Sequence, residues 1–162
     1  MTTINTEKLI AFHGDHQLKA DMLREIEWHR KQDMIVQGTY GAGDGNDFRG
    51  CAVGCSIHSL NRLKGLDLSL SDHGEYESHL GIPRIIARLE EGIFEGLPTE
   101  QSLTWPGCFL EAIPVGADLS LVGPKFAHWL LVDETDGVIK HVKKDSTKKA
   151  IQDIAALYDR WI

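Results

Sequence analysis

The 162-residue chain has no apolar run that approaches the roughly 18 residues a membrane span needs. Basic residues are scarce, because 17 Lys and Arg against 24 Asp and Glu give a formal net charge of −7. Only three cysteines are present, and an odd number does not fit a disulfide framework. These absences argue against a membrane protein, a general nucleic-acid binder and a disulfide-stabilised domain.

The remaining composition is typical of a folded domain. Hydrophobic residues make up 42% of the chain, which is enough to bury a core of normal size at this length. Residues 1–10 lack the basic-then-apolar pattern of a secretory signal, and no repeat or linker divides the sequence. We therefore expect one cytoplasmic domain over residues 1–162.

Apolar residues recur mainly at helical spacing, which predicts a mainly α, compact multi-helix fold. Asp15 is a plausible N-cap for the first helix, and Pro83 can occupy the first position of the third. The Asp136-Gly137 pair permits one small β-hairpin within 129–142. The expected helices span 15–37, 51–63, 83–97, 99–110, 124–131 and 146–162.

The third and the last expected helices are amphipathic. The apolar side of 83–97 is predicted to be core, and its opposite side to be wet and acidic, with Glu90, Glu91 and Glu95. The core side carries Ile82, Ile85, Ile86, Leu89 and Ile93. The apolar stripe of 146–162 is expected to pack against the rest of the protein and to close the domain.

The first expected helix carries polar groups on the side that should be buried. His29 and Asp33 lie there one turn apart, so the carboxylate could fix the imidazole's tautomer and make it a better base or ligand. A satisfied buried pair is the structural alternative. Trp28, about a quarter turn away, could stack on an adenine or nicotinamide ring, although packing against a neighbouring helix is commoner.

The second expected helix gives a sharper pattern. Cys51, Cys55, His58 and Arg62 follow spacings of four, three and four, so they form one line. The opposite side carries Val53, Ile57 and Leu60. We expect this apolar side to face the core and the thiol side to face a cleft, while simple packing of both cysteines is the structural alternative.

One interpretation of this line is an anion site at the start of the helix. The glycine-rich loop 38–47 ends in a helix whose first amides lack intrahelical partners, and the helix dipole favours negative charge there. The expected ligand-binding residues are His29, Asp33, Arg49, Gly50, Cys51, Ala52 and Arg62. The loop matches neither the Walker A pattern nor the dinucleotide fingerprint.

A second interpretation is catalysis. Cys51 or Cys55 would be the nucleophile, its pKa lowered by the helix start, with His58 or His29 as the base and Asp33 orienting it. A third interpretation is zinc bound by Cys51, Cys55 and His58 together with His29, His13 or a carboxylate. Cysteines spaced by four do not match the common zinc knuckle, so no metal ligand is assigned and the cofactor is left unknown.

Several longer strings are similar to a known group of sequences. These are Phe12-His13-Gly14-Asp15, the run Gly50 to Ser59 (GCAVGCSIHS), Leu80-Gly81-Ile82-Pro83, the run Ile93 to Leu97 (IFEGL) and the run Phe109 to Leu119 (FLEAIPVGADL). Together they resemble a family of uncharacterised proteins of bacterial and bacteriophage genomes. The resemblance covers nearly the whole chain and implies no activity, so no catalytic residue is carried over.

The leading hypothesis is a helical protein that binds a small phosphorylated, nucleotide-derived molecule. A bacteriophage setting favours a counter-defence role in which the protein captures a nucleotide signal of the host. The alternatives are a cysteine-dependent hydrolase or transferase, and an acidic inhibitor that contacts a host protein through Glu90 to Glu95. Assembly into a homo-oligomer is left open.

Overall fold

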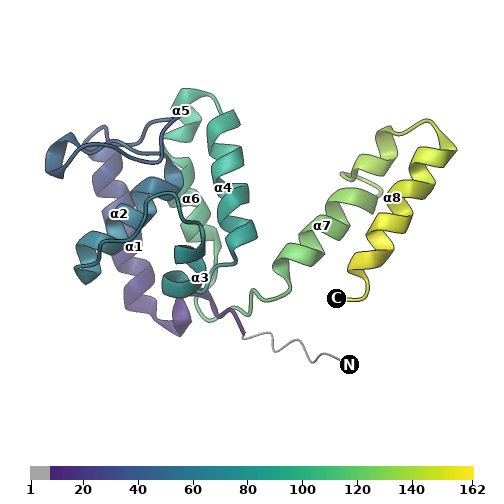
Figure 1. Ribbon diagram of the computed structural model, residues 1–162, viewed down its shortest axis with the longest axis horizontal. Helices are drawn as coiled ribbons and strands as arrows, with labels where there is room; N and C mark the ends of the chain where they lie inside the picture. The colour runs from purple at the N-terminus through teal and green to yellow at the C-terminus, as the bar shows by residue number, and fades with distance from the viewer. Residues whose placement is uncertain (1–7) are drawn as a thin grey trace. The chain divides into compact units, whose positions relative to one another are not determined.

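The computed structural model describes residues 8–162 and confirms a mainly α-helical protein (Figure 1). The helices are α1 (His16–Lys31), α2 (Ala52–Lys64), α3 (Gly74–Leu80), α4 (Arg84–Gly96), α5 (Thr99–Ser102), α6 (Trp105–Ala112), α7 (Val122–Val132) and α8 (Asp145–Tyr158), with 3-10 turns at Ala11–Gly14, Gly45–Asp47 and Val138–His141. Within residues 8–162 the only β-type pairings that lie outside the helices are isolated bridges. No helix in this part of the chain is both long enough and apolar enough to cross a membrane.

The chain divides into two compact units, Met1–Leu119 (unit 1) and Ser120–Ile162 (unit 2). In unit 1, α1 packs against α2 and α6, while α2 also packs against α4. In unit 2, α7 packs against α8. That residues 1–162 form one domain stays a prediction.

Helix α1 begins where the sequence predicts and ends earlier. The side chain of Asp15 accepts hydrogen bonds from the amides of Gln17 and Leu18, at 2.7 and 3.1 Å, and so caps the helix start. The helix ends at Lys31 rather than at residue 37, and Asp33 follows it with a left-handed φ of 53°. The next residues are extended, because the amide of Gly50 donates to the Met34 carbonyl at 2.9 Å.

Helix α2 is buried on all sides over its first turns, rather than on one side as expected. Residues 51–57 are all buried, so neither Cys51 nor Cys55 faces an open cleft. The loop before the helix lies directly against it. A Cβ atom added to Gly54 would lie 1.4 Å from the carbonyl oxygen of Tyr40, so only glycine allows this approach.

Helix α4 differs from the expected division into an apolar and an acidic side. Ile85, predicted to be core, is 57% exposed, while Glu90, predicted to face water, is fully buried. Glu91 is half-buried and Glu95 is exposed. Because Glu90 points inward, the expected acidic contact surface over Glu90 to Glu95 does not form as one exposed face.

In unit 2 the expected hairpin at 129–142 is wrong. The Asp133 carboxylate accepts hydrogen bonds from the amides of Thr135 and Asp136, at 2.9 and 2.8 Å. The amide of Gly137 donates to the Asp133 carbonyl at 2.9 Å. These bonds end α7 in a tight turn, so the Asp136-Gly137 pair belongs to a helix end and not to a two-residue hairpin loop.

The apolar stripe of α8 is only partly covered within unit 2. Ala155 is its buried residue, whereas Ile154, Trp161 and Ile162 are 47 to 53% exposed. That this stripe packs against the rest of the protein and closes the domain stays a prediction.

Replacing Gly54 with Ala should destabilise unit 1 by about 1–3 kcal/mol or more, because the new methyl group meets a backbone carbonyl that cannot move without the loop. Urea-induced unfolding measures the change. The matched control is Gly92→Ala on α4, where an added Cβ meets nothing within 4 Å. That variant should gain about 0.5–1 kcal/mol, and equal effects of the two substitutions would contradict the packing argument.

Candidate functional site

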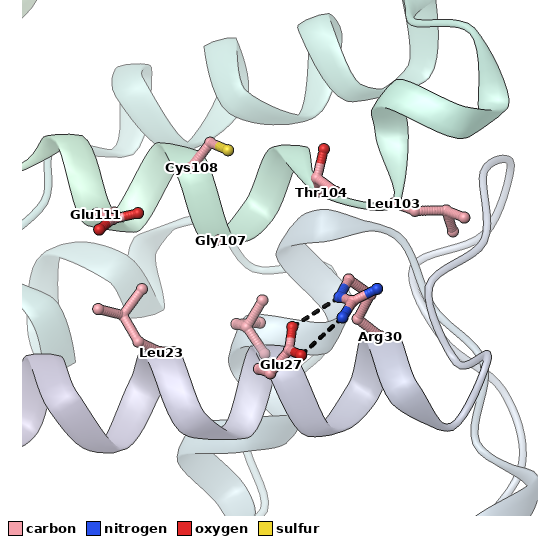
Figure 2. Close-up of a pocket in the computed structure, with 9 residues that line it drawn as sticks. Leu23, Glu27, Arg30, Leu103, Thr104, Gly107, Cys108 and Glu111 are labelled. Atoms are coloured by element: carbon pink, nitrogen blue, oxygen red, sulfur yellow. Dashed lines mark hydrogen bonds and ion pairs between the residues drawn. The ribbon is translucent and has the colours of Figure 1, made fainter.

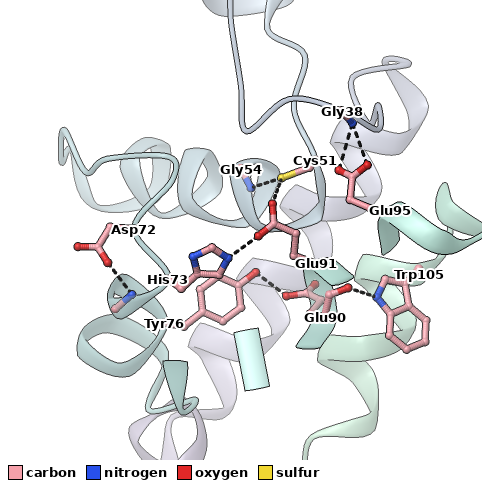
Figure 3. Close-up of polar contacts among 11 residues, drawn as sticks. Gly38, Cys51, Gly54, Asp72, His73, Tyr76, Glu90, Glu91, Glu95 and Trp105 are labelled. Atoms are coloured by element: carbon pink, nitrogen blue, oxygen red, sulfur yellow. Dashed lines mark hydrogen bonds and ion pairs between the residues drawn. The ribbon is translucent and has the colours of Figure 1, made fainter. Parts of the chain in front are cut away.

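Glu91 on α4 links side chains from other parts of unit 1 (Figure 3). One carboxylate oxygen accepts a hydrogen bond from the thiol of Cys51 at 3.6 Å, and the other accepts one from Nε2 of His73. Cys51 directly precedes α2, and His73 directly precedes α3. The ring of Tyr40 meets the His73 ring edge to face, with centroids 5.8 Å apart. We call Tyr40, Cys51, His73, Glu91 and Glu95 the Glu91 cluster.

Glu95 lies one turn further along α4, on the same side of the cluster. Its two carboxylate oxygens accept from the amide of Gly38 at 3.1 and 2.9 Å, which fixes the side chain (Figure 3). Donor atoms of Cys51, Glu91 and Glu95 all lie within 4.8 Å of one another. One thiol and two carboxylates are therefore close enough to share a single cation.

Burial controls the ionisation of the cluster. Burial, with a smaller contribution from the nearby Glu91 carboxylate, raises the pKa of the Cys51 thiol to about 12, although the hydrogen bond from the Gly54 amide opposes the shift. Burial and Glu91 also raise the pKa of Tyr40. Both groups therefore keep their protons at neutral pH. This does not fit a Cys51 thiolate that attacks a substrate in the protein as described.

Glu90 lies beneath the cluster in the core. One carboxylate oxygen accepts from the hydroxyl of Tyr76 at 2.8 Å, and its backbone carbonyl accepts from the indole nitrogen of Trp105 at 3.0 Å. Burial raises the pKa of Glu90 to about 8. Glu90 thus carries its proton at neutral pH and adds no negative charge beside Glu91.

At the expected anion site, several of the donor groups already form hydrogen bonds within the protein. The amide of Gly50 donates to Met34, and that of Cys51 donates to the Thr39 carbonyl at 2.7 Å. The Arg49 guanidinium donates to the carbonyls of Asn46 and Phe48, at 3.1 and 2.7 Å. Ala52 is fully buried. With Glu91 beside the helix start as well, the surroundings there suit a cation better than an anion.

A second group of the expected residues does meet, between α1 and α2. The Nδ1 atom of His29 is 2.7 Å from the Glu25 carbonyl oxygen, and its Nε2 is 2.8 Å from Nδ1 of His58. Phe48 stacks on His58, with centroids 3.9 Å apart. Asp33 lies outside α1, so the expected contact between Asp33 and His29 does not form.

The expected pairing of the thiols with these imidazoles does not form either. Cys55 lies 3.3 Å from the carbonyl oxygen of Gly50, which is its closest partner, and Cys51 contacts Glu91. His58 instead forms a hydrogen bond with His29. Arg62 forms an ion pair with Glu25 at 2.9 Å and contacts neither cysteine.

The sequence did not predict a site at His73 or Tyr40, and it placed Glu91 only on the acidic contact surface of the inhibitor alternative. The usable signal was the spacing of four between Glu91 and Glu95, which places two carboxylates on one side of a helix. His73 lies in a polar stretch and carried no pattern. No protein-family model, curated protein or solved structure matches the chain.

The buried imidazole pair predicts a loss of stability in acid. Burial, and then the charges that His58 and Arg62 bring, lower the pKa of His29 from 6.5 to about 4, while its bond to the Glu25 carbonyl opposes the shift. Burial and Arg62 also lower the pKa of His58, which Glu25 opposes. As the pH falls below 6.5, the unfolded chain takes up the His29 proton before the folded protein does. The free energy of unfolding should therefore drop by up to about 3 kcal/mol between pH 6.5 and 4.

Urea unfolding at a series of pH values tests this expectation. His29→Gln removes the titrating group, so its free energy of unfolding should fall less steeply between pH 6.5 and 4 than that of the wild type. His16→Gln, an exposed change on the same helix, is the matched control. Identical slopes for wild type and His29→Gln would show that His29 does not set the pH dependence.

Proposed function

We propose that the protein binds a divalent transition metal of the zinc class through Cys51, Glu91 and Glu95. The observation that carries this proposal is the 3.6 Å between the Cys51 sulfur and a Glu91 oxygen. Zinc bond lengths to sulfur and oxygen, with tetrahedral angles, place two such ligands about 3.6 Å apart. The two atoms therefore already have the spacing of two ligands on one ion.

The neighbours of these donors support the proposal. Ligating carboxylates in metal sites are usually held by hydrogen bonds from an outer layer of residues. His73 supplies such a bond to Glu91, and the Gly38 amide supplies one to Glu95. His73 and the Glu91 side chain are largely buried, at 9 and 17% exposed. The donors are thus held in position before any metal arrives.

The donor set favours zinc over magnesium or calcium, because a thiolate is a soft ligand and the hard cations prefer oxygen alone. A bound cation would displace the proton of Cys51 and balance the charge that the thiolate leaves in this buried place. Three protein donors leave one coordination position for water or a substrate atom, which is typical of catalytic rather than structural zinc sites.

Cobalt(II) titration of the purified, metal-free protein tests the proposal. Cobalt replaces zinc in thiolate sites and gives a sulfur-to-metal charge-transfer absorption. We expect one equivalent of cobalt to produce this band and zinc to remove it by competition. Elemental analysis of protein refilled with zinc and desalted should show about one zinc per chain.

Variants identify the ligands. Cys51→Ser should abolish the band, and Glu91→Gln or Glu95→Gln should weaken binding. His73→Leu removes the orienting bond but no ligand, so it should keep the band and lose roughly 10- to 100-fold in affinity. The control is Cys108→Ser, an exposed cysteine outside the cluster. A band that survives in Cys51→Ser, or no band in the wild type, would sink the proposal.

A further inference from the structure

The outer side of α1 carries a second candidate site, an aromatic and basic surface around Trp28. The Arg62 guanidinium lies over the ring of Trp28, 4.0 Å from its centroid, and Glu25 holds the same guanidinium at 2.9 Å. Trp28 also lines an open hollow of about 460 Å³, with Leu23, Arg24, Glu27 and Lys31. An aromatic ring and two basic side chains therefore border one accessible space.

A second hollow, of about 330 Å³, lies between α1 and α6 (Figure 2). Leu23 and Glu27 line both hollows, so the two adjoin along α1. Arg30 and Thr104 border the second one, and Figure 2 shows the Arg30 guanidinium beside the Glu27 carboxylate. Each volume lies in the range of roughly 300–1,000 Å³ that is usual for small-molecule sites.

Basic side chains are frequent around this surface, and each is paired with a carboxylate. Residues 1–119 contain ten Lys and Arg, and Arg24, Arg30, Lys31 and Arg62 are four of them. Arg24 pairs with Asp21, Arg30 and Lys31 pair with Glu27, and Arg62 pairs with Glu25. Hydrogen bonding to Arg30 lowers the pKa of Glu27 to about 2, so this carboxylate stays ionised and holds Arg30 and Lys31 in place. The side chains in these ion pairs are 41 to 64% exposed.

Exposed ion pairs are weak, so the oxygens of a phosphate group can compete with these carboxylates for the cations. Arginine forks fit phosphate oxygens in a bidentate manner. Aromatic rings stack on bases of any identity, and a guanidinium that already lies on the ring reinforces such a platform.

We propose that this double hollow binds a nucleotide, with the base stacked on Trp28 and the phosphates held by Arg24, Arg30 and Lys31. The binding site is thus the outer side of α1, and not the start of α2 where the sequence pattern placed it. Of the residues that the sequence predicted to bind the ligand, Arg62 lies at this surface, over the Trp28 ring. The inference is independent of the metal proposal, because the two sites share no residue.

Isothermal titration calorimetry with full-length protein tests the inference, using ATP, GTP, NAD and a cyclic dinucleotide as probes. At least one probe should bind with one-to-one stoichiometry and weaken as salt increases. Trp28→Leu should reduce its affinity by about five- to a hundredfold, the effect of losing one stacked base. Trp28→Phe, which keeps an aromatic ring, should restore part of that loss.

Matched controls separate stacking from charge. Trp129→Leu changes an exposed tryptophan of unit 2 and should leave nucleotide affinity unchanged. Arg24→Gln combined with Lys31→Gln should weaken nucleotides, while Arg84→Gln, another exposed arginine, should not. Cys51→Ser, which removes the proposed metal ligand, should not affect nucleotide binding.

Two results would overturn the inference. One is that Trp28→Leu keeps the melting temperature of the wild type and binds every probe as the wild type does. The other is that inorganic tripolyphosphate binds as tightly as ATP and Trp28→Leu changes neither, which would indicate general anion attraction without base recognition.

Discussion

The packing of the loop 38–41 against the start of α2 is the constraint on which the rest of unit 1 depends. It requires the Tyr40 carbonyl to touch the backbone at Gly54. Once there, the loop supplies the Thr39 carbonyl to the Cys51 amide and the Gly38 amide to Glu95. A helix start normally offers free amides to an anion. Here the loop satisfies an amide and fixes a carboxylate nearby, and the proposed cation site at this helix start rests on both contacts.

Two neighbouring glutamates on α4 show how helix geometry divides acidic groups between core and site. Consecutive helical residues point about 100° apart, so Glu90 enters the core while Glu91 reaches the cluster. In the core, Tyr76 gives Glu90 one hydrogen bond, and its other carboxylate oxygen has no partner within hydrogen-bond geometry among the described residues. Protonation removes the charge that would make such burial costly. Glu91, by contrast, has donors on both oxygens.

Local signals predicted much of the fold and little of the site. A capping carboxylate such as Asp15, and apolar periodicity, are properties of neighbouring residues, and they located most of the helices. They missed α3, and the stretch expected over 99–110 is two helices, α5 and α6. The end of α1 escaped prediction because Met34 and the residues after it pair with Gly50, a contact that no local pattern encodes. The same holds for the site. Cys51 stood out by spacing, but its partners Glu91 and His73 come from distant segments that tertiary packing brings to it.

The histidine pair between α1 and α2 also fixes where its protons lie. A carbonyl oxygen can only accept, so His29 must carry its proton on Nδ1, facing Glu25. Its Nε2 then has a lone pair, and this nitrogen accepts the Nδ1 proton of His58. His58 is left with a bare Nε2, while the stacked Phe48 opposes rotation of the ring. The Glu25 carbonyl on α1 thus determines, through His29, which nitrogen of His58 on α2 carries the proton. The free nitrogen of His58 is therefore an acceptor and not a donor.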